Sequence, residues 1–94
     1  MIKIVIERRI MPGLEEEYEQ AAREAMRASV SARGFIAGES LCERHHPERR
    51  LLITQWRDLS AWKDWLHSSE RERVMQRVKP LLADEEHIRV YEHR

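Results

Sequence analysis

The stretch at residues 50–57 carries apolar side chains on both faces of a predicted strand, and this feature constrains the fold most. By alternation, Leu51 and Ile53 point to one side of the strand, whereas Leu52 and Trp56 point to the other. An antiparallel sheet with one face in water would alternate cleanly between apolar and polar residues. Both faces of this sheet therefore need a covering layer.

A strand of the same two-sided character is predicted at residues 2–10, where Val5 lies opposite Ile4 and Ile6. Periodicity and turn residues then predict a helix, two strands, a helical stretch and a last strand, at residues 14–32, 35–45, 50–57, 58–80 and 86–93. This β-α-β-β-α-β order predicts a ferredoxin-like α+β fold, with the helices on one face of an antiparallel sheet. The 94 residues fit a single domain, 1–94.

The second face of the predicted sheet has no element of the chain left to cover it. A domain this short buries a limited share of its surface and is only marginally stable alone. We therefore expect a homodimer, in which a second copy packs sheet against sheet on the face that carries Val5, Leu51 and Ile53.

Turns and irregular positions are predicted at three places. Pro12 followed by Gly13 is typical of a type II turn, because glycine adopts positive φ at little cost. Residues 46–49 are predicted to form the turn between the two middle strands. Gly38 is a possible bulge within the strand at residues 35–45.

The second helical stretch has its own start and stop signals. Asp58 or Ser60 can cap its beginning. Ser69 has capping-box spacing with Glu72, which would restart or continue the helix. Pro80 should kink or end it, because proline lacks the N–H that the helix needs.

The charge pattern bears on partners and location. Seventeen basic residues balance seventeen acidic ones, so no net field attracts nucleic acid or an anionic membrane. We expect the basic run on the second helix to be a solvated face, since glutamates interleave with it: Arg71, Arg73, Arg77 and Lys79. The single cysteine, Cys42, cannot form an internal disulfide, and the N-terminal apolar run is interrupted by charge. We expect a cytoplasmic protein.

Two kinds of side chain are candidates for a site. Trp56, Trp62 and Trp65 are bulky indoles that could pack a core or line a pocket for a flat apolar ligand. Arg8 shares a strand face with Ile4 and Ile6; there it could hold an anion, or it could lie in solvent beyond the core. The five histidines form no metal-binding pattern, and no phosphate loop or nucleophile elbow is present.

Three stretches, together with the element order, resemble the antibiotic biosynthesis monooxygenase family over nearly the whole chain. They are Met11–Gly13 with the following Glu17-Tyr18, then Gly34–Leu41, then Gln55–Trp62. The resemblance implies a dimeric α+β barrel with a pocket between sheet and helices in each subunit. Some members of the family oxidise polycyclic aromatic polyketides with molecular oxygen and no cofactor, a related branch binds and degrades haem, and many others have no settled activity.

The resemblance carries over to individual positions. Trp56 matches a tryptophan of the polyketide oxygenases, while Trp62, Leu52 and Gln76 fall at or near the positions of their tyrosine, asparagine and arginine. Among the haem degraders, Trp65 matches an essential tryptophan, whereas Met75 and Arg8 replace a histidine and an asparagine. This sequence contains no asparagine.

These observations leave three hypotheses. The first is a cofactor-independent monooxygenase that acts on an aromatic or quinol-like molecule, with Arg8 and Trp56 as its catalytic residues. The second is a haem-binding or haem-degrading protein. The third is a binding dimer without catalysis. In each case we expect an apolar pocket between the helices and the sheet, lined by Ile4, Ile6, Leu52, Thr54, Trp62, Trp65 and Met75.

Overall fold

Strand β1 (Ile2–Arg9) lies in the interior of a four-stranded sheet of the order β2-β3-β1-β4. The computed structural model describes residues 1–94. The other elements, in chain order, are α1 (Glu15–Val30), β2 (Phe35–Glu43), β3 (His46–Trp56), α2 (Leu59–Leu66), α3 (Ser69–Val78), a 3-10 turn (Lys79–Leu81) and β4 (His87–Glu92). All the strand pairs are antiparallel, which confirms the predicted ferredoxin-like α+β fold.

The register of the sheet decides which side chains face the helices. In β1, Ile4 pairs with Thr54, Ile6 with Leu52, and Arg8 with Arg50. Residues 2, 4, 6 and 8 are buried while their neighbours are partly or fully exposed, as period-2 alternation requires. Arg8 therefore continues the same inward-facing row as the isoleucines.

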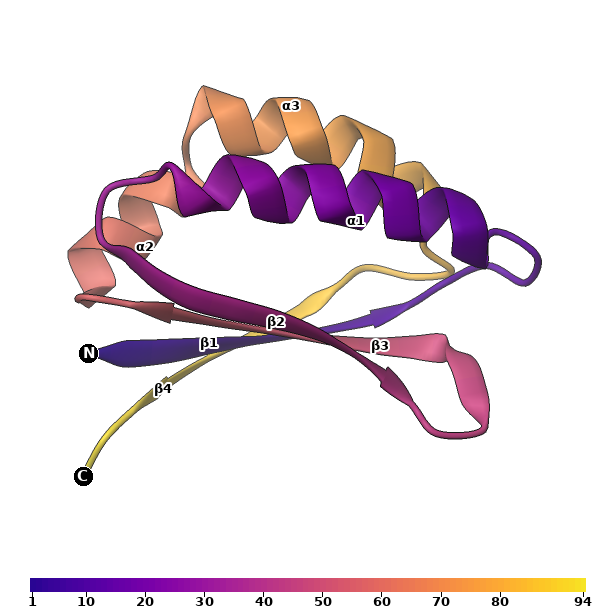
Figure 1. The fold of residues 1–94 in the computed structure, drawn as a ribbon, viewed down its shortest axis with the longest axis horizontal. Helices are drawn as coiled ribbons and strands as arrows, with labels where there is room; N and C mark the ends of the chain where they lie inside the picture. The colour runs from indigo at the N-terminus through magenta and orange to yellow at the C-terminus, as the bar shows by residue number, and fades with distance from the viewer.

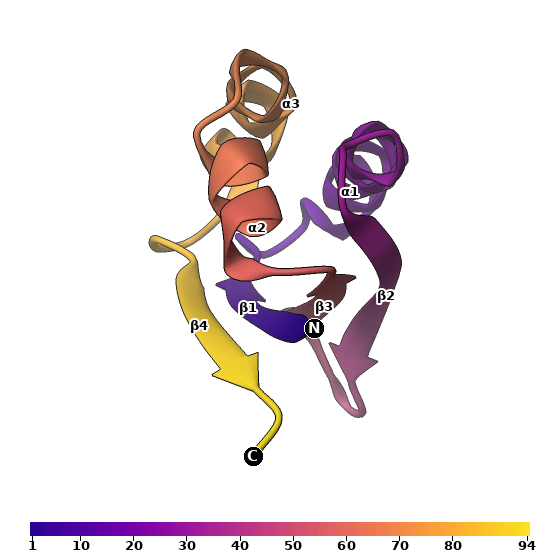
Figure 2. The same ribbon diagram turned by 90° about the vertical axis from the view of Figure 1, so that its left-hand side faces the viewer.

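All three helices lie on one side of the twisted sheet (Figures 1 and 2). One hydrophobic cluster joins β1 and Trp56 to the α2 indoles, and a second joins α1 to the end of α3 through Tyr18, Met75 and Val78. These two clusters form the layer between sheet and helices. None of the helices combines the length and the apolar character that a membrane span needs.

No element of the chain covers the other face of the sheet (Figure 2). Val5, Leu51 and Ile53 lie on this face and are half-buried by their neighbours alone. On the edge strand β4, Ile88 and Val90 share the helix-facing side with Ile6 and Ile4, yet both are exposed. The helices thus leave β4 bare on its inner side as well.

The turn predicted at residues 46–49 is wrong, because β3 begins at His46 and the turn falls at Arg44 and His45. His45 adopts a positive φ of 69° there. Pro47 is tolerated inside β3 because the ladder to β2 is irregular between Cys42 and Glu43.

Two further local predictions need correction. The bulge in β2 lies between Phe35 and Ala37, not at Gly38, which pairs regularly with Thr54. The cap of α3 is Ser68 rather than Ser69, since the Ser68 hydroxyl accepts from the Arg71 backbone N–H at 3.1 Å.

Other local predictions are confirmed. Asp58 caps α2 by accepting from the Ala61 N–H at 2.8 Å. Helix α3 ends at Val78, and Pro80 lies in the 3-10 turn that follows. Gly13 has a positive φ of 87°, as the predicted turn requires.

Candidate functional site

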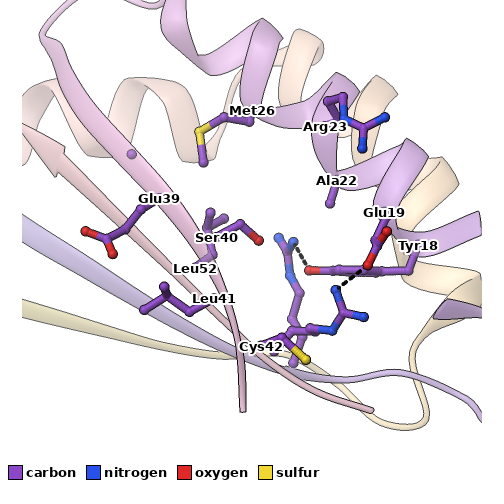
Figure 3. A pocket seen from close by; sticks show the side chains of 13 residues that line it. Tyr18, Glu19, Ala22, Arg23, Met26, Glu39, Ser40, Leu41, Cys42 and Leu52 are labelled. Carbon is purple, nitrogen blue, oxygen red and sulfur yellow. Dashed lines mark hydrogen bonds and ion pairs between the residues drawn. The ribbon is translucent and has the colours of Figure 1, made fainter. Parts of the chain in front are cut away.

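A hollow of about 430 Å³ lies between α1 and the β2–β3 hairpin. Its size falls within the range of small-molecule sites. Figure 3 shows Tyr18, Ala22 and Met26 on the α1 side of this hollow. These residues are spaced four apart, so they share one helix face. The thirteen lining residues are Arg8, Tyr18, Glu19, Ala22, Arg23, Met26, Gly38, Glu39, Ser40, Leu41, Cys42, Arg50 and Leu52.

Arg8 borders this hollow as a buried cation, with only 6% of its surface exposed. Its Nε donates to Glu86 Oε1 at 2.9 Å and its Nη1 donates to the Tyr18 hydroxyl at 3.1 Å. Its Nη2 contacts the Met75 sulfur at 3.7 Å. The guanidinium is therefore fixed from three sides, by α1, by α3 and by the segment that precedes β4.

Glu86 is the only carboxylate paired with two buried arginines. Its Oε1 accepts from Arg8, and its Oε2 accepts from Arg71 Nη2 at 3.0 Å. Burial alone would raise the pKa of Glu86, but the charges of Arg8 and Arg71 outweigh burial and lower that pKa. Burial would likewise lower the pKa of Arg8, but Tyr18 and Glu86 outweigh it and raise that pKa. Arg8 and Glu86 are therefore both ionised at neutral pH.

Tyr18 stands between two guanidinium groups. The guanidinium carbon Cζ of Arg8 lies 6.0 Å from the centre of the Tyr18 ring, and that of Arg50 lies 5.6 Å from it. Cations at this separation are attracted to the face of an aromatic ring. Arg50 is itself paired with Glu19 at 3.2 Å. Figure 3 marks both this ion pair and the hydrogen bond to the Tyr18 hydroxyl.

The indoles pack into one cluster beside the hollow. Trp56 has no exposed surface, and its ring centre lies 5.8 Å from that of Trp62 and 6.3 Å from that of Trp65. Its Nε1–H donates to Thr54 Oγ1 at 2.9 Å, which satisfies both polar groups inside the core.

The residues predicted to line the ligand pocket do come together, but little space remains among them. A cavity of only about 30 Å³, roughly enough for one water, is bordered by Arg8 and by six of the predicted lining residues: Ile6, Leu52, Thr54, Trp62, Trp65 and Met75. Ile4 and Trp56 do not border it and lie in the core. The roles of these residues in binding stay predictions. Arg8 and Leu52 border both this cavity and the larger hollow.

Sequence reasoning missed four residues of the site. Tyr18 counted only as part of an apolar helix face, and Glu86 and Arg50 had no signal in the sequence. Arg71 was predicted to belong to a solvated basic face; this is wrong, because it is buried beside Glu86 and lies over the Trp62 ring at 5.9 Å. Its position three residues after the Ser68 cap turns it inward, away from Arg73 and Arg77.

A second hollow, of about 600 Å³, includes residues of the uncovered sheet face, among them Leu41 and Leu51. Ion pairs on this face join Arg9 to Asp84, Arg49 to Glu43 and Arg89 to Glu7. The hollow borders the surface that the sequence predicts to be paired with another subunit. No group of three or more His, Cys, Asp or Glu side chains is placed to hold a metal ion.

Comparisons with known proteins agree on the fold. The family described as antibiotic biosynthesis monooxygenase matches residues 1–77. No curated protein matches this chain.

Solved structures match almost the entire chain. A conserved protein from Methanosarcina mazei has a TM-score of 0.91 at 17% identity, covering 99% of this chain and 92% of that protein. SnoaB, a cofactor-independent oxygenase from Streptomyces nogalater, has a TM-score of 0.87 at 17% identity, covering 99% and 93%. A Pseudomonas aeruginosa protein has a TM-score of 0.82 at 21% identity, covering 99% and 94%. At these identities the likeness establishes the fold.

Proposed function

Since this chain belongs to the antibiotic biosynthesis monooxygenase family, we propose that it is a cofactor-independent monooxygenase that acts on an aromatic or quinol-like small molecule. The observation that carries the proposal is the buried, ionised Arg8 at the border of a hollow of about 430 Å³. A fixed cation in a site of low dielectric is what an oxygenation through a substrate anion requires. A structural neighbour, SnoaB, is a cofactor-independent oxygenase, which supports the same class of reaction.

In the proposed reaction the substrate itself reduces oxygen. A ring methylene of the substrate loses a proton, and the resulting carbanion, drawn as an enolate or phenolate, passes its electrons to molecular oxygen. A carbon–oxygen bond forms and gives a hydroperoxide. The O–O bond then breaks as the second hydrogen leaves the same carbon, so that the products are a ketone or quinone and one water. The protein has to stabilise the anion and exclude bulk water.

Individual side chains are proposed to divide this work. Arg8 would stabilise the negative oxygen of the substrate, because its guanidinium is held in place by Glu86 and Tyr18. Trp56 would stabilise the packed wall behind Arg8 through its hydrogen bond to Thr54. Of the residues predicted to line the pocket, Leu52 would contribute to the apolar wall of the hollow. The others would form the packed layer behind that wall: Ile4, Ile6, Thr54, Trp62, Trp65 and Met75.

The working unit is proposed to be a homodimer that buries the uncovered sheet face. Val5, Leu51 and Ile53 form an apolar strip across two neighbouring strands of that face. The neighbouring Leu41 on β2, which pairs with Leu51 and is exposed, extends this apolar strip to the edge of the sheet. Such a surface on a 94-residue domain is typical of a subunit interface.

The haem hypothesis receives no support from the site. Met75, at the position of the family's haem-ligating histidine, lies in the core with its sulfur against Arg8. A binding dimer without catalysis is the alternative that the experiment below separates from the oxygenase.

The test is oxygen consumption with a panel of anthrones and 1-naphthols, whose keto tautomers carry the ring methylene that the reaction needs. We expect uptake of one oxygen molecule per substrate, well above autoxidation, and one atom of labelled oxygen in the product carbonyl. If panel members bind without raising oxygen uptake, the oxygenase proposal is wrong and the binding dimer is supported.

A further inference from the structure

Three hydrogen-bond donors at the border of the hollow have no acceptor in the protein. The Tyr18 hydroxyl accepts from Arg8, but no acceptor receives its own hydrogen, although Tyr18 is only 2% exposed. A guanidinium has five N–H groups. Arg8 uses three of them, on Glu86, Tyr18 and Met75, which leaves two. Each of these side-chain atoms already has one partner, and the remaining hydrogens are free to meet acceptors on an occupant of the hollow.

The charges beside the hollow are also unbalanced. Arg8 and Arg71 share the single carboxylate of Glu86, so this buried group carries one net positive charge. The neighbouring Arg50 has its own counter-ion in Glu19 and adds no net charge. A buried charge without a partner is costly. An occupant with one negative charge would complete the group.

We propose that Tyr18 is a ligand-binding residue whose hydroxyl, together with Arg8, donates to one anionic oxygen of the molecule in the hollow. Tyr18 is suited to this role because Arg8 donates to a lone pair of its hydroxyl oxygen. The hydroxyl hydrogen therefore points away from Arg8 and can be donated to a ligand. Figure 3 shows the hydroxyl directed toward the space between α1 and β2. The assignment of that oxygen to the reacting ring rests on the proposed oxygenase function; the anion-binding role does not.

Tyr18 and Arg8 together determine which kind of ligand the hollow favours. Two donors on one oxygen, backed by one net positive charge, favour a phenolate, enolate or carboxylate over a neutral ring of the same shape. The apolar side chains that line the same hollow, Ala22, Met26 and Leu52, favour an aromatic body. For an oxygenase substrate, binding the oxygen as an anion would ease the loss of the proton that starts the reaction.

The experiment uses three small probes and the full-length protein. 4-Nitrophenol, at a mildly alkaline pH that ionises it, is compared with its neutral analogue 4-nitroanisole and with benzoate. We expect wild type to bind 4-nitrophenolate at least about tenfold more tightly than 4-nitroanisole, as expected for a hydrogen bond to a charged group. Tyr18→Phe should weaken 4-nitrophenolate binding about tenfold and leave 4-nitroanisole binding unchanged. Tyr91→Phe, which removes an exposed hydroxyl from β4, is the matched control.

The outcomes separate this proposal from the oxygenase function. Measurable and equal affinity of wild type for 4-nitrophenolate and 4-nitroanisole would overturn the proposal without any variant, even if Tyr18→Phe fails to fold, and so would the failure of wild type to bind either 4-nitrophenolate or benzoate. An equal loss for both probes in Tyr18→Phe would also overturn it. Tight benzoate binding that depends on Tyr18, without phenolate binding, supports the anion site and counts against the oxygenase. Oxygen uptake on an anthrone that Tyr18→Phe leaves unchanged supports the oxygenase and counts against Tyr18.

Discussion

Arg8 and Glu86 lie 78 positions apart in the sequence, yet the Arg8 Nε donates to Glu86 Oε1 at 2.9 Å inside the protein. One comes from the first strand and the other from the segment just before the last strand. Glu86 also binds Arg71 of α3, so a single carboxylate ties the sheet, a helix and the final connection together. The site therefore depends on the complete chain being folded.

Arg8→Lys should lower kcat about a hundredfold on any substrate that the oxygen assay identifies, the size of effect seen when one donor to a developing oxyanion is lost. Lysine keeps the charge and can pair with Glu86, but it cannot also reach Tyr18 and Met75 in the geometry of the guanidinium. Arg9→Lys, on the same strand but on the outer face, should leave kcat unchanged. Steady-state kinetics of both variants provide the measurement.

Trp56→Phe supplies the comparison for that experiment. It should mainly raise KM, because it changes the wall of the site rather than the group that meets the charge. A larger fall of kcat in Trp56→Phe than in Arg8→Lys would contradict the roles proposed for both residues.

The stability of the protein should fall in acid because of Glu86. Its folded pKa is lowered beneath the ordinary value of 4.5 by Arg8 and Arg71, so its stabilising effect is complete above that pH. The effect should be lost as the pH falls through the lower folded pKa. Glu86→Gln should lower the free energy of unfolding by about 3 kcal/mol at neutral pH, as breaking a buried ion pair does. It should also make that free energy fall less steeply as the pH is lowered.

Urea unfolding from neutral pH to pH 3 measures this effect, with Glu85→Gln as the control on the exposed neighbour. If the stability of Glu86→Gln falls with decreasing pH as steeply as that of wild type, other carboxylates control stability in acid.

Ile53→Glu should break the predicted dimer and give a monomer or aggregate. The substitution places a charge in the middle of the uncovered sheet face, opposite Val5, where burial against a partner would be costly. Gln76→Glu adds the same charge on an exposed position of α3 and should leave the dimer intact. Sedimentation velocity distinguishes the species, and a stable wild-type monomer at micromolar concentration would refute the interface.

Haem should not bind in an ordered geometry. Met75 replaces the ligating histidine of the haem degraders and is buried against Arg8, while the nearest histidine in sequence, His67, is exposed at the end of α2. Titration should therefore give no sharp, stoichiometric shift of the Soret band. Tight binding that disappears in His67→Ala would mean that His67 is the ligand and that this expectation is wrong.

Gly34→Ala should destabilise the fold by about 3 kcal/mol, because two effects combine there. Gly34 has a φ of 83°, and a Cβ at this position would collide with the Ala61 side chain. Gly13→Ala separates the two effects, since Gly13 has a φ of 87° but open space around it. It should cost only about 1–2 kcal/mol of backbone strain. If thermal unfolding shows the same loss of stability for Gly34→Ala and Gly13→Ala, the contact between α2 and Gly34 is not tight.

The sequence by itself determined the architecture. Period-2 alternation at Ile4 and Ile6, the helical period through Tyr18, and the Asp58 cap are all local signals, which the backbone follows because neighbouring residues suffice to satisfy them. The uncovered sheet face could also be predicted, since Val5 and Ile53 point away from every available helix. The hairpin turn and the α3 cap were predicted a few residues away from their true positions, because several polar residues there compete for one role. The bulge in β2 and the burial of Arg71 were also predicted wrongly, since both depend on contacts with other elements.

Only the tertiary structure decided the chemistry of the site. The sequence placed Arg8 on the inner face but left open whether the protein or solvent surrounds it there. Its partners Glu86, Tyr18 and Arg71 come from three elements that meet only after folding, and no local pattern records long-range ion pairs. The three tryptophans show the same limit: their spacing allowed a pocket or a core, and the space left among them was fixed by how tightly α2 and α3 pack on the sheet. The ligand-sized hollow instead lies between α1 and the β2–β3 hairpin, a position that depends on sheet twist and helix placement rather than on any local motif.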